Sequence, residues 1–334
     1  MRPQHATRSP VLTRRSALAG LAAAGAAMIG GAPRRSEGRG EEEKKTKGGI
    51  CVSPGGGPNM RIKAPILVDP DDAMWRVALD GSWIAVALSP DARTLICRRR
   101  DDYVGGGTWS ADLGGGGEPR KIADEVGWFL WSADGKRLVF TEVGDQGRSH
   151  KTWRMNADGT GRVALGVPET ERVVDWSADG RWFLTFSGAD APRGEPVRSG
   201  PLRLMRTDGG DSRLVTDEAF PATFPRLAPD GRSVVFAHHS PGKLDWTLWM
   251  VDADGKNRRP FLTERDGEMA VQAVWSPDGK RLAVLSIDSV AGPDGSPRPS
   301  LPLAQHLDVA DADGKRRRRL PVLEDLIYTL CDWR

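Results

Sequence analysis

Short apolar runs alternate with tight polar turns along most of the chain. A typical case is Asp134-Gly135, which stands between an apolar run ending at Trp131 and the run Arg137–Thr141. Asp-Gly between two such runs is a strong signal for a tight β-hairpin, because glycine accepts a positive φ and aspartate hydrogen-bonds to its own backbone. The pattern predicts an all-β protein made of many short antiparallel strands.

One motif recurs along the chain at a nearly constant spacing. It reads Ser-Pro-Asp-Gly-Lys in its fullest copy, and successive copies begin 43, 45, 51 and 48 residues apart. An apolar run that often ends in tryptophan precedes the motif, and another strand pattern follows it. The predicted repeat turns are Asp134-Gly135, Asp179-Gly180, Asp230-Gly231 and Asp278-Gly279, with a variant at Asp91-Ala92. A fixed period of this length indicates a repeat architecture.

A second turn follows in each repeat, as at Asp158-Gly159 and Asp254-Gly255. Two hairpins per repeat give four strands, and four short strands are marginally stable alone, so successive units must stack or close into a ring. Eight of the 12 tryptophans fall at two repeat positions, represented by Trp131 and Trp153. We expect these indoles to fill the space between neighbouring sheets rather than to bind a ligand.

The two ends of the chain carry parts of the same repeat. Leu330–Arg334 matches the start of a further copy, Ile50–Gly56 looks like a degenerate copy, and Trp75–Gly81 follows it at the expected distance. We therefore expect the C-terminal strand to complete the N-terminal unit, which would remove the exposed sheet edges. The short interval from Gly81 to Ser89 leaves open whether this first unit has its outer strand.

The pattern Trp-Ser-Pro-Asp-Gly-Lys-Arg-Leu at 275–282, with the later Asp-Ala-Asp-Gly turns, resembles the PD40 (WD40-like) repeats of TolB-type proteins. The resemblance covers roughly residues 50–334 and implies a six-bladed β-propeller of four-stranded antiparallel blades. It also implies an exported location and binding of a protein or peptide partner at the cell envelope. TolB has an additional N-terminal α/β domain, for which we expect no room here, so a role in the Tol system is not implied.

The N-terminal segment has the composition of an export signal. Arg14 and Arg15 precede a weakly apolar stretch rich in Ala and Gly, which resembles a twin-arginine signal peptide over residues 1–32. Residues 33–49 are read as a charged, disordered linker, and 50–334 as the propeller. The expected location is periplasmic or otherwise extracytoplasmic in a bacterium. The alternative is a cytoplasmic protein with a disordered Ala-rich tail.

Composition narrows the choice of partners. Without residues 1–32, which hold four arginines and no acid, the net charge changes from +3 to −1. The body of the protein therefore gives no general basis for nucleic-acid binding. No run of apolar residues is long enough for a membrane-spanning helix after signal removal. We expect a monomer that binds an envelope protein, a peptide segment or a polysaccharide.

The long connections of all repeats should lie at one face of the ring, where loops on a rigid scaffold commonly bind ligands. The candidate binding residues on this face are Glu171, Arg172, His238, His239, Arg265 and Glu268. Their mixed charges suit a polar ligand or a peptide. The alternative is that these connections are merely solvated.

The histidines are the strongest indication of an enzyme. Propeller lyases that act on uronate sugars are similar in repeat type and use a metal bound by histidine. The chain has no His-x-His spacing, and the side chains of the adjacent pair His238-His239 would point to opposite faces of a strand. We therefore expect a non-catalytic protein with no cofactor and no metal. The alternative is a lyase-like, carbohydrate-active propeller enzyme with a His-bound metal.

Three cysteines and one basic run complete the chemistry. An odd number of cysteines leaves at least one free thiol. Cys97 lies in an apolar strand pattern, whereas Cys51 and Cys331 would meet if the chain ends meet, and whether they pair stays open. The run Lys315–Arg319 follows an Asp-Gly turn and is expected to be a solvated outer strand.

Overall fold

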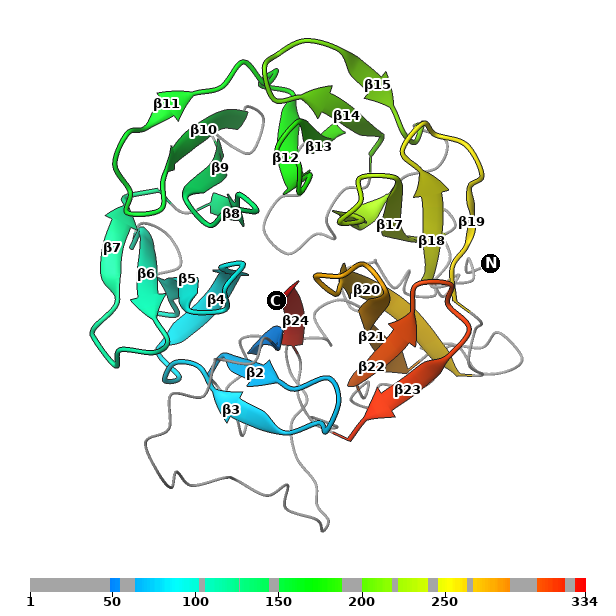
Figure 1. Ribbon diagram of the computed structural model, residues 1–334, viewed down its shortest axis with the longest axis horizontal. Helices are drawn as coiled ribbons and strands as arrows, with labels where there is room; N and C mark the ends of the chain where they lie inside the picture. The colour runs from blue at the N-terminus through cyan, green and yellow to red at the C-terminus, as the bar shows by residue number, and fades with distance from the viewer. Residues whose placement is uncertain are drawn as a thin grey trace, which may run out of the picture.

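Six four-stranded antiparallel sheets are arranged as the blades of a ring around a central axis (Figure 1). The computed structural model describes residues 49–54, 64–101, 106–125, 127–143, 150–187, 200–217, 222–239, 246–262, 267–288, 305–321 and 328–334. These residues form strands and turns and no helix. The prediction of an all-β, six-bladed propeller is confirmed. Among the described residues, therefore, no helix could cross a lipid bilayer.

The blades are numbered in chain order. Within each blade the strands are named from the innermost to the outermost. Blade 1 contains β24 (Tyr328–Trp333), β1 (Ile50–Pro54), β2 (Ile66–Val68) and β3 (Trp75–Val77). Blade 2 contains β4 (Trp83–Leu88), β5 (Thr94–Arg99), β6 (Thr108–Asp112) and β7 (Arg120–Ala123). Blade 3 contains β8 (Gly127–Trp131), β9 (Arg137–Val143), β10 (His150–Asn156) and β11 (Val163–Ala164).

The remaining three blades repeat this order. Blade 4 contains β12 (Glu171–Trp176), β13 (Trp182–Ser187), β14 (Leu202–Arg206) and β15 (Ser212–Leu214). Blade 5 contains β16 (Thr223–Leu227), β17 (Ser233–His238), β18 (Thr247–Asp252) and β19 (Arg259–Pro260). Blade 6 contains β20 (Glu268–Trp275), β21 (Arg281–Asp288), β22 (Gln305–Asp311) and β23 (Arg317–Leu320).

The repeat motif forms the turn between the first and second strands of a blade. In blade 3 the Ser132 hydroxyl donates to Asp134 at 2.6 Å, and the amide of Lys136 donates to the same carboxylate oxygen at 3.0 Å. Gly135 closes the turn with a φ of +67°. The hydroxyl of Ser132 lowers the pKa of Asp134, because its hydrogen bond favours the ionised carboxylate. Because these hydrogen bonds join residues close together in the sequence, the turn can be predicted from its motif.

The two ends of the chain meet in blade 1. Strand β24 pairs with β1 in antiparallel register, from Ile50 opposite Trp333 to Pro54 opposite Tyr328. The amide of Arg334 also donates to the carbonyl of Gly49 at 3.2 Å. The prediction that the C-terminal strand completes the N-terminal unit is confirmed.

Blade 1 is complete, although its residues are distributed differently from the sequence interpretation. Its first turn is replaced by the two chain ends, so Ser53 and Pro54 end the second strand rather than form a hairpin. Trp75 consequently lies on the outer strand β3, and the turn before it begins at Asp69. Gly81 belongs to the connection to blade 2. The interval to Ser89 is short because no further strand of blade 1 has to fit there.

Apolar clusters fill the six seams between neighbouring blades. Five of the seams are represented by Val274 with Ile50, Leu67 with Leu88, Ile96 with Phe129, Val139 with Val173, and Leu204 with Val234. The sixth, between blades 5 and 6, contains Val235 and Val284. Tryptophans at the ends of inner strands contribute to this packing, and Trp131 donates from Nε1 to the carbonyl of Ala87 in blade 2 at 3.4 Å. The seams therefore hold the ring together.

Polar side chains link the inner strands at the end of the ring where the repeat turns lie. Asp175 of β12 accepts from the amide of Leu227 in β16 at 2.7 Å, and Asp332 of β24 accepts from the amide of Leu88 in β4 at 3.2 Å. Arg226 of β16 lies between them and donates to the Cys331 carbonyl at 3.5 Å. Burial raises the pKa of Asp175, and the positive charge of Arg226 opposes this effect.

Replacing Trp333 should open the closing blade. Trp333 is 3% exposed in the seam between blades 6 and 1, so Trp333→Ala should lower the free energy of unfolding by about 3–5 kcal/mol. Trp128 of β8 is 48% exposed, and Trp128→Ala should cost about 1 kcal/mol or less. Urea denaturation followed by circular dichroism measures both. Equal losses in the two variants would contradict the closure of the ring by β24.

The raised pKa of Asp175 should make stability fall as the pH rises. The native state holds this proton more tightly than the unfolded chain, so the contribution of Asp175 to stability declines from the unfolded-state pKa, about 3.9, through the higher native pKa. Asp175→Asn lacks this decline. Asp208 is the matched control with the opposite pH dependence. Hydrogen bonding to Arg206 lowers its pKa to about 2, so its contribution to stability is lost as the pH falls. A wild-type curve parallel to that of Asp175→Asn from pH 3 to 8 would refute the assignment.

Candidate functional site

One end of the ring carries most of the residues expected to bind a ligand. Inner strands begin at this end, so we call it the long-link face. Glu171 and Arg172 are the first two residues of β12, His238 ends β17 with His239 directly after it, and Glu268 begins β20. Arg265 lies outside the described residues, as do Arg14 and Arg15 of the predicted signal peptide. The remaining five residues are divided between blades 4, 5 and 6.

The seam between blades 3 and 4 is polar at the long-link face. Thr141 of β9 and Thr152 of β10 are cross-strand neighbours on the side of blade 3 that packs against blade 4. Their hydroxyls are buried, and no described residue forms a hydrogen bond with either oxygen. Across the seam, Thr185 donates a hydrogen bond to Glu171, whose side chain is also buried. The seam thus combines a carboxylate with hydroxyls that retain unused hydrogen-bonding capacity.

An exposed indole lies on the innermost strand beside this seam. Trp128 of β8 pairs with Thr141, so it points to the same side of blade 3, and it is 48% exposed. The guanidinium carbon of Arg172 lies 5.9 Å from the centre of the Trp128 ring and 5.6 Å from that of Phe186. Arg172 is itself buried. It therefore supports the indole from within, while the indole presents an apolar surface to solvent.

Further arginines surround the same face. Arg203 of β14 approaches Glu171 through Nε at 3.5 Å, and its side chain is 39% exposed. In blade 2, Arg99 lies 5.5 Å above the ring of Trp83, and Arg100 donates to a backbone carbonyl at 3.1 Å. Burial lowers the pKa of Arg100. The long-link face over blades 2–4 therefore combines exposed guanidinium groups with one exposed indole, a combination suited to an anionic ligand that has apolar faces.

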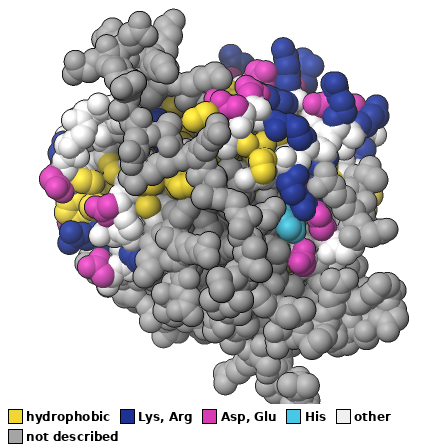
Figure 2. Space-filling view, turned by 90° about the horizontal axis from the view of Figure 1, so that it is seen from below, with side chains coloured by type: hydrophobic (Ala, Val, Ile, Leu, Met, Phe, Trp, Pro, Cys, Tyr) yellow, Lys and Arg dark blue, Asp and Glu magenta, His cyan; other side chains and the backbone are white. Residues whose placement is uncertain are grey.

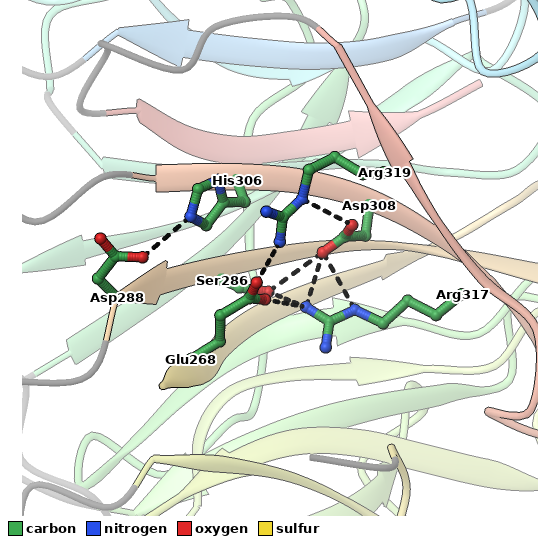
Figure 3. A network of polar contacts seen from close by, with 7 residues as sticks. All are labelled: Glu268, Ser286, Asp288, His306, Asp308, Arg317 and Arg319. Carbon is green, nitrogen blue, oxygen red and sulfur yellow. Dashed lines mark hydrogen bonds and ion pairs between the residues drawn. The ribbon is translucent and has the colours of Figure 1, made fainter. Parts of the chain in front are cut away.

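Glu268 is engaged in a charge network within the seam between blades 5 and 6 (Figure 3). Arg317 donates to Asp308 at 2.6 Å and to Glu268 at 3.2 Å, and it also bonds to the Ser286 hydroxyl. Arg319 donates to Glu268 at 2.5 Å and to Asp308 at 3.4 Å. Asp308 is completely buried. Two acids and two arginines balance one another, so this network holds β23 against the blade.

The sequence suggested that the basic run Lys315–Arg319 is a solvated outer strand. In the structure the run is only partly exposed to solvent. Arg317 is only 8% exposed, because alternate residues of β23 turn toward the seam. The exposed members are Lys315, Arg316 and Arg318. They belong to blade 6, and Figure 2 shows Lys and Arg side chains gathered on that side of the ring. Strand alternation, applied to five consecutive basic residues, would have indicated this division.

His238, His239 and His306 each contact a different side chain. The ring centre of His238 lies 6.0 Å from that of Trp249, and the ring centre of His239 lies 4.3 Å from that of Trp246. His306 of β22 contacts Asp288 through Nε2 at 3.0 Å (Figure 3). Among the described residues no three His, Cys, Asp or Glu side chains come close enough to hold a metal ion. The donor set expected for a His-bound metal is therefore not assembled within this part of the chain.

Sequence reasoning missed the indole of the blade 3–4 seam and one of its two arginines, Arg203. Trp128 and Arg203 each stand at a definite repeat position, the second residue of the first and of the third strand. Aligning the repeats would have placed both at the long-link face. The contact of Trp128 with Arg172 across the seam depends on how neighbouring blades twist and pack, which the repeat pattern does not encode.

No family model matches the chain. Two curated sequences are similar to part of it, the oligogalacturonide lyase of Pectobacterium atrosepticum and the oligogalacturonate lyase of Dickeya dadantii. Each is 26% identical over 151 residues, which cover 43% of this chain and 36% of the relative. The chain thus matches little more than a third of the length of these relatives. This finding overturns the expectation of a non-catalytic protein, because the curated sequences that resemble the chain are enzymes.

The fold has solved counterparts among TolB proteins. A TolB-type protein from Agrobacterium tumefaciens superposes with a TM-score of 0.61 at 18% identity, covering 86% of this chain and 93% of that one. TolB from Acinetobacter baumannii superposes with a TM-score of 0.60 at 15% identity, covering 85% and 66%. At these identities the likeness concerns the fold. The chain is a TolB-like β-propeller in architecture.

Proposed function

We propose that the chain binds an acidic oligosaccharide at the long-link face, over the seam between blades 3 and 4. The observation that carries the proposal is the exposed indole of Trp128 beside the guanidinium group of Arg172, with Arg203 paired to Glu171 in the same seam. Sugars stack their C–H faces on aromatic rings, and uronate sugars add a carboxylate for each residue. A guanidinium group matches a carboxylate in charge and in planar geometry. The names of the similar curated proteins support the galacturonide class.

Each group would meet a different part of such a ligand. Trp128 offers the stacking surface, and Arg203 offers a charged side chain that is 39% exposed. Arg172 is buried behind the indole and fixes its orientation. The hydroxyls of Thr141 and Thr152, with which no described residue forms a hydrogen bond, are buried in the same seam. Binding energy would thus come from a few groups placed on rigid strands.

A lyase reaction on the bound uronate is the second candidate function. The similarity to lyases favours it, and elimination next to a carboxylate requires that the carboxylate charge be neutralised while a proton is removed. Arg203 could supply that neutralisation. The described residues do not assemble a metal site, so we derive no step through a metal. Unsaturated uronate products absorb in the ultraviolet, which makes this reaction directly observable.

Three expectations from the sequence remain predictions. Binding of a protein or peptide partner at the cell envelope, and monomeric behaviour without nucleic-acid binding, rest on the resemblance and on composition. Export rests on Arg14 and Arg15. Fractionation of cells that produce the full chain would test the location, and recovery in the cytoplasm alone would exclude export.

Removing the indole should weaken binding of trigalacturonate. Trp128→Ala and Arg203→Ala should each raise the dissociation constant about tenfold or more, because each removes roughly 1.4 kcal/mol or more of contact energy. Isothermal titration calorimetry measures this, and ultraviolet absorbance of the same mixtures reports elimination. Arg316→Ala is the matched control on blade 6, since Arg316 is exposed and remote from the seam, and its affinity should be unchanged.

A neutral galactan trimer is the second control. The proposal requires that the wild-type chain prefer the acidic trimer, because the arginines select the carboxylates. Equal binding of both trimers, or unchanged affinity in Trp128→Ala, would remove this site from consideration.

A further inference from the structure

Two thiols from opposite ends of the chain lie together in blade 1. Cys51 is the second residue of β1, and Cys331 lies on the neighbouring strand β24. Cys51 pairs with Asp332, and the register then shifts so that Val52 pairs with Leu330, which leaves Cys331 unpaired in the ladder beside Cys51. Both side chains are buried in the same apolar cluster, at 0% and 7% exposure. Both are free thiols in the structure, and the Cys331 thiol donates to the carbonyl of Ala85 in blade 2 at 3.5 Å.

Cys97 has no such neighbour among the described residues. It lies in a different cluster, with Trp83 and Ala111 of blade 2, and its thiol is directed at the carbonyl of Trp109 at 3.8 Å. Burial raises the pKa of the Cys97 thiol to about 12. The odd cysteine of the chain is therefore Cys97, and the pair is Cys51 with Cys331.

We propose that Cys51 and Cys331 form an intrachain disulfide that covalently closes the propeller ring. β1 and β24 are adjacent antiparallel strands, and both thiols lie in the apolar cluster between blades 1 and 2. The Cα spacing across such a strand pair falls in the range that a disulfide bridges. The bond would join β1 to β24 at the position where the chain ends already pair through backbone hydrogen bonds. It would convert a noncovalent closure into a covalent one.

The reaction requires a disulfide oxidant, for which oxidised glutathione or the disulfide of a dithiol oxidase suffices. One cysteine thiolate attacks a sulfur of the oxidant and releases one thiol, which gives a mixed disulfide. The second cysteine thiolate then attacks the protein sulfur of that mixed disulfide and releases the second thiol. The two cysteines lose two protons and two electrons, and the oxidant is reduced to two thiols.

The folded environment determines when the bond forms. The neighbouring Cys331 thiol and burial together raise the pKa of Cys51, so little reactive thiolate is present once β24 has docked. Oxidation should therefore be fast while the chain folds and slow in the reduced native protein. Once formed, the bond should stabilise the ring, because it connects residues near both ends and restricts the unfolded chain.

The experiment is refolding of the wild-type chain in an oxidising glutathione buffer. One thiol per chain should then react with Ellman's reagent in denaturant, against three after reduction, and peptide mapping without reductant should link the Cys51 peptide to the Cys331 peptide. Reduction should lower Tm by about 5 °C or more. Cys97→Ala should keep both the link and the shift, whereas Cys331→Ala should lose both.

The wild-type thiol count keeps the proposal testable even if the variants fold poorly. A chain that refolds to the native β-sheet signal in circular dichroism and still shows three reactive thiols would overturn it. A link that includes Cys97 would overturn it as well. Neither outcome bears on oligosaccharide binding at the long-link face, which lies over other blades.

Discussion

Each blade of this protein depends on its neighbours, because a short four-stranded sheet cannot bury its own faces. The largest buried side chains lie in the seams, where Ile96 of blade 2 packs with Phe129 of blade 3 and Leu184 of blade 4 packs with Phe236 of blade 5. A ring satisfies this requirement for every blade at once, whereas an open stack leaves two faces uncovered. The pairing of β24 with β1 is the contact on which this arrangement depends.

The fold was predictable where local chemistry decides the structure. The turn at Asp134-Gly135 is held by hydrogen bonds among residues that are close in sequence, so its motif predicts it and, by repetition, the blades. Blade 1 was misinterpreted because chain ends stand where its first turn would be. Trp75 was consequently assigned to the third strand, although it lies on the outer one. A motif marks a turn well but cannot indicate that a turn is missing.

The candidate site was only partly predictable, for a related reason. Glu171 and Arg172 were found because the inter-blade connections of a repeat fold gather at one face. No role was predicted for Trp128. Glu268 was predicted to bind a ligand, but it forms ion pairs with Arg317 and Arg319. Whether a charged residue meets solvent or an opposite charge depends on the neighbouring strand and blade. That information lies in contacts between residues distant in sequence, which a repeat pattern does not specify.

Hydrogen exchange of the native chain, followed by mass spectrometry, tests the closed ring most directly. Amides of β1 and β24 are hydrogen-bonded to each other, so their peptides should be protected to the same degree as those of β12 and β13 in blade 4. Equal protection is the result that closure predicts. Rapid exchange of the β24 peptide, with blades 2–6 still protected, would show that the last strand is not docked and that the ring is open.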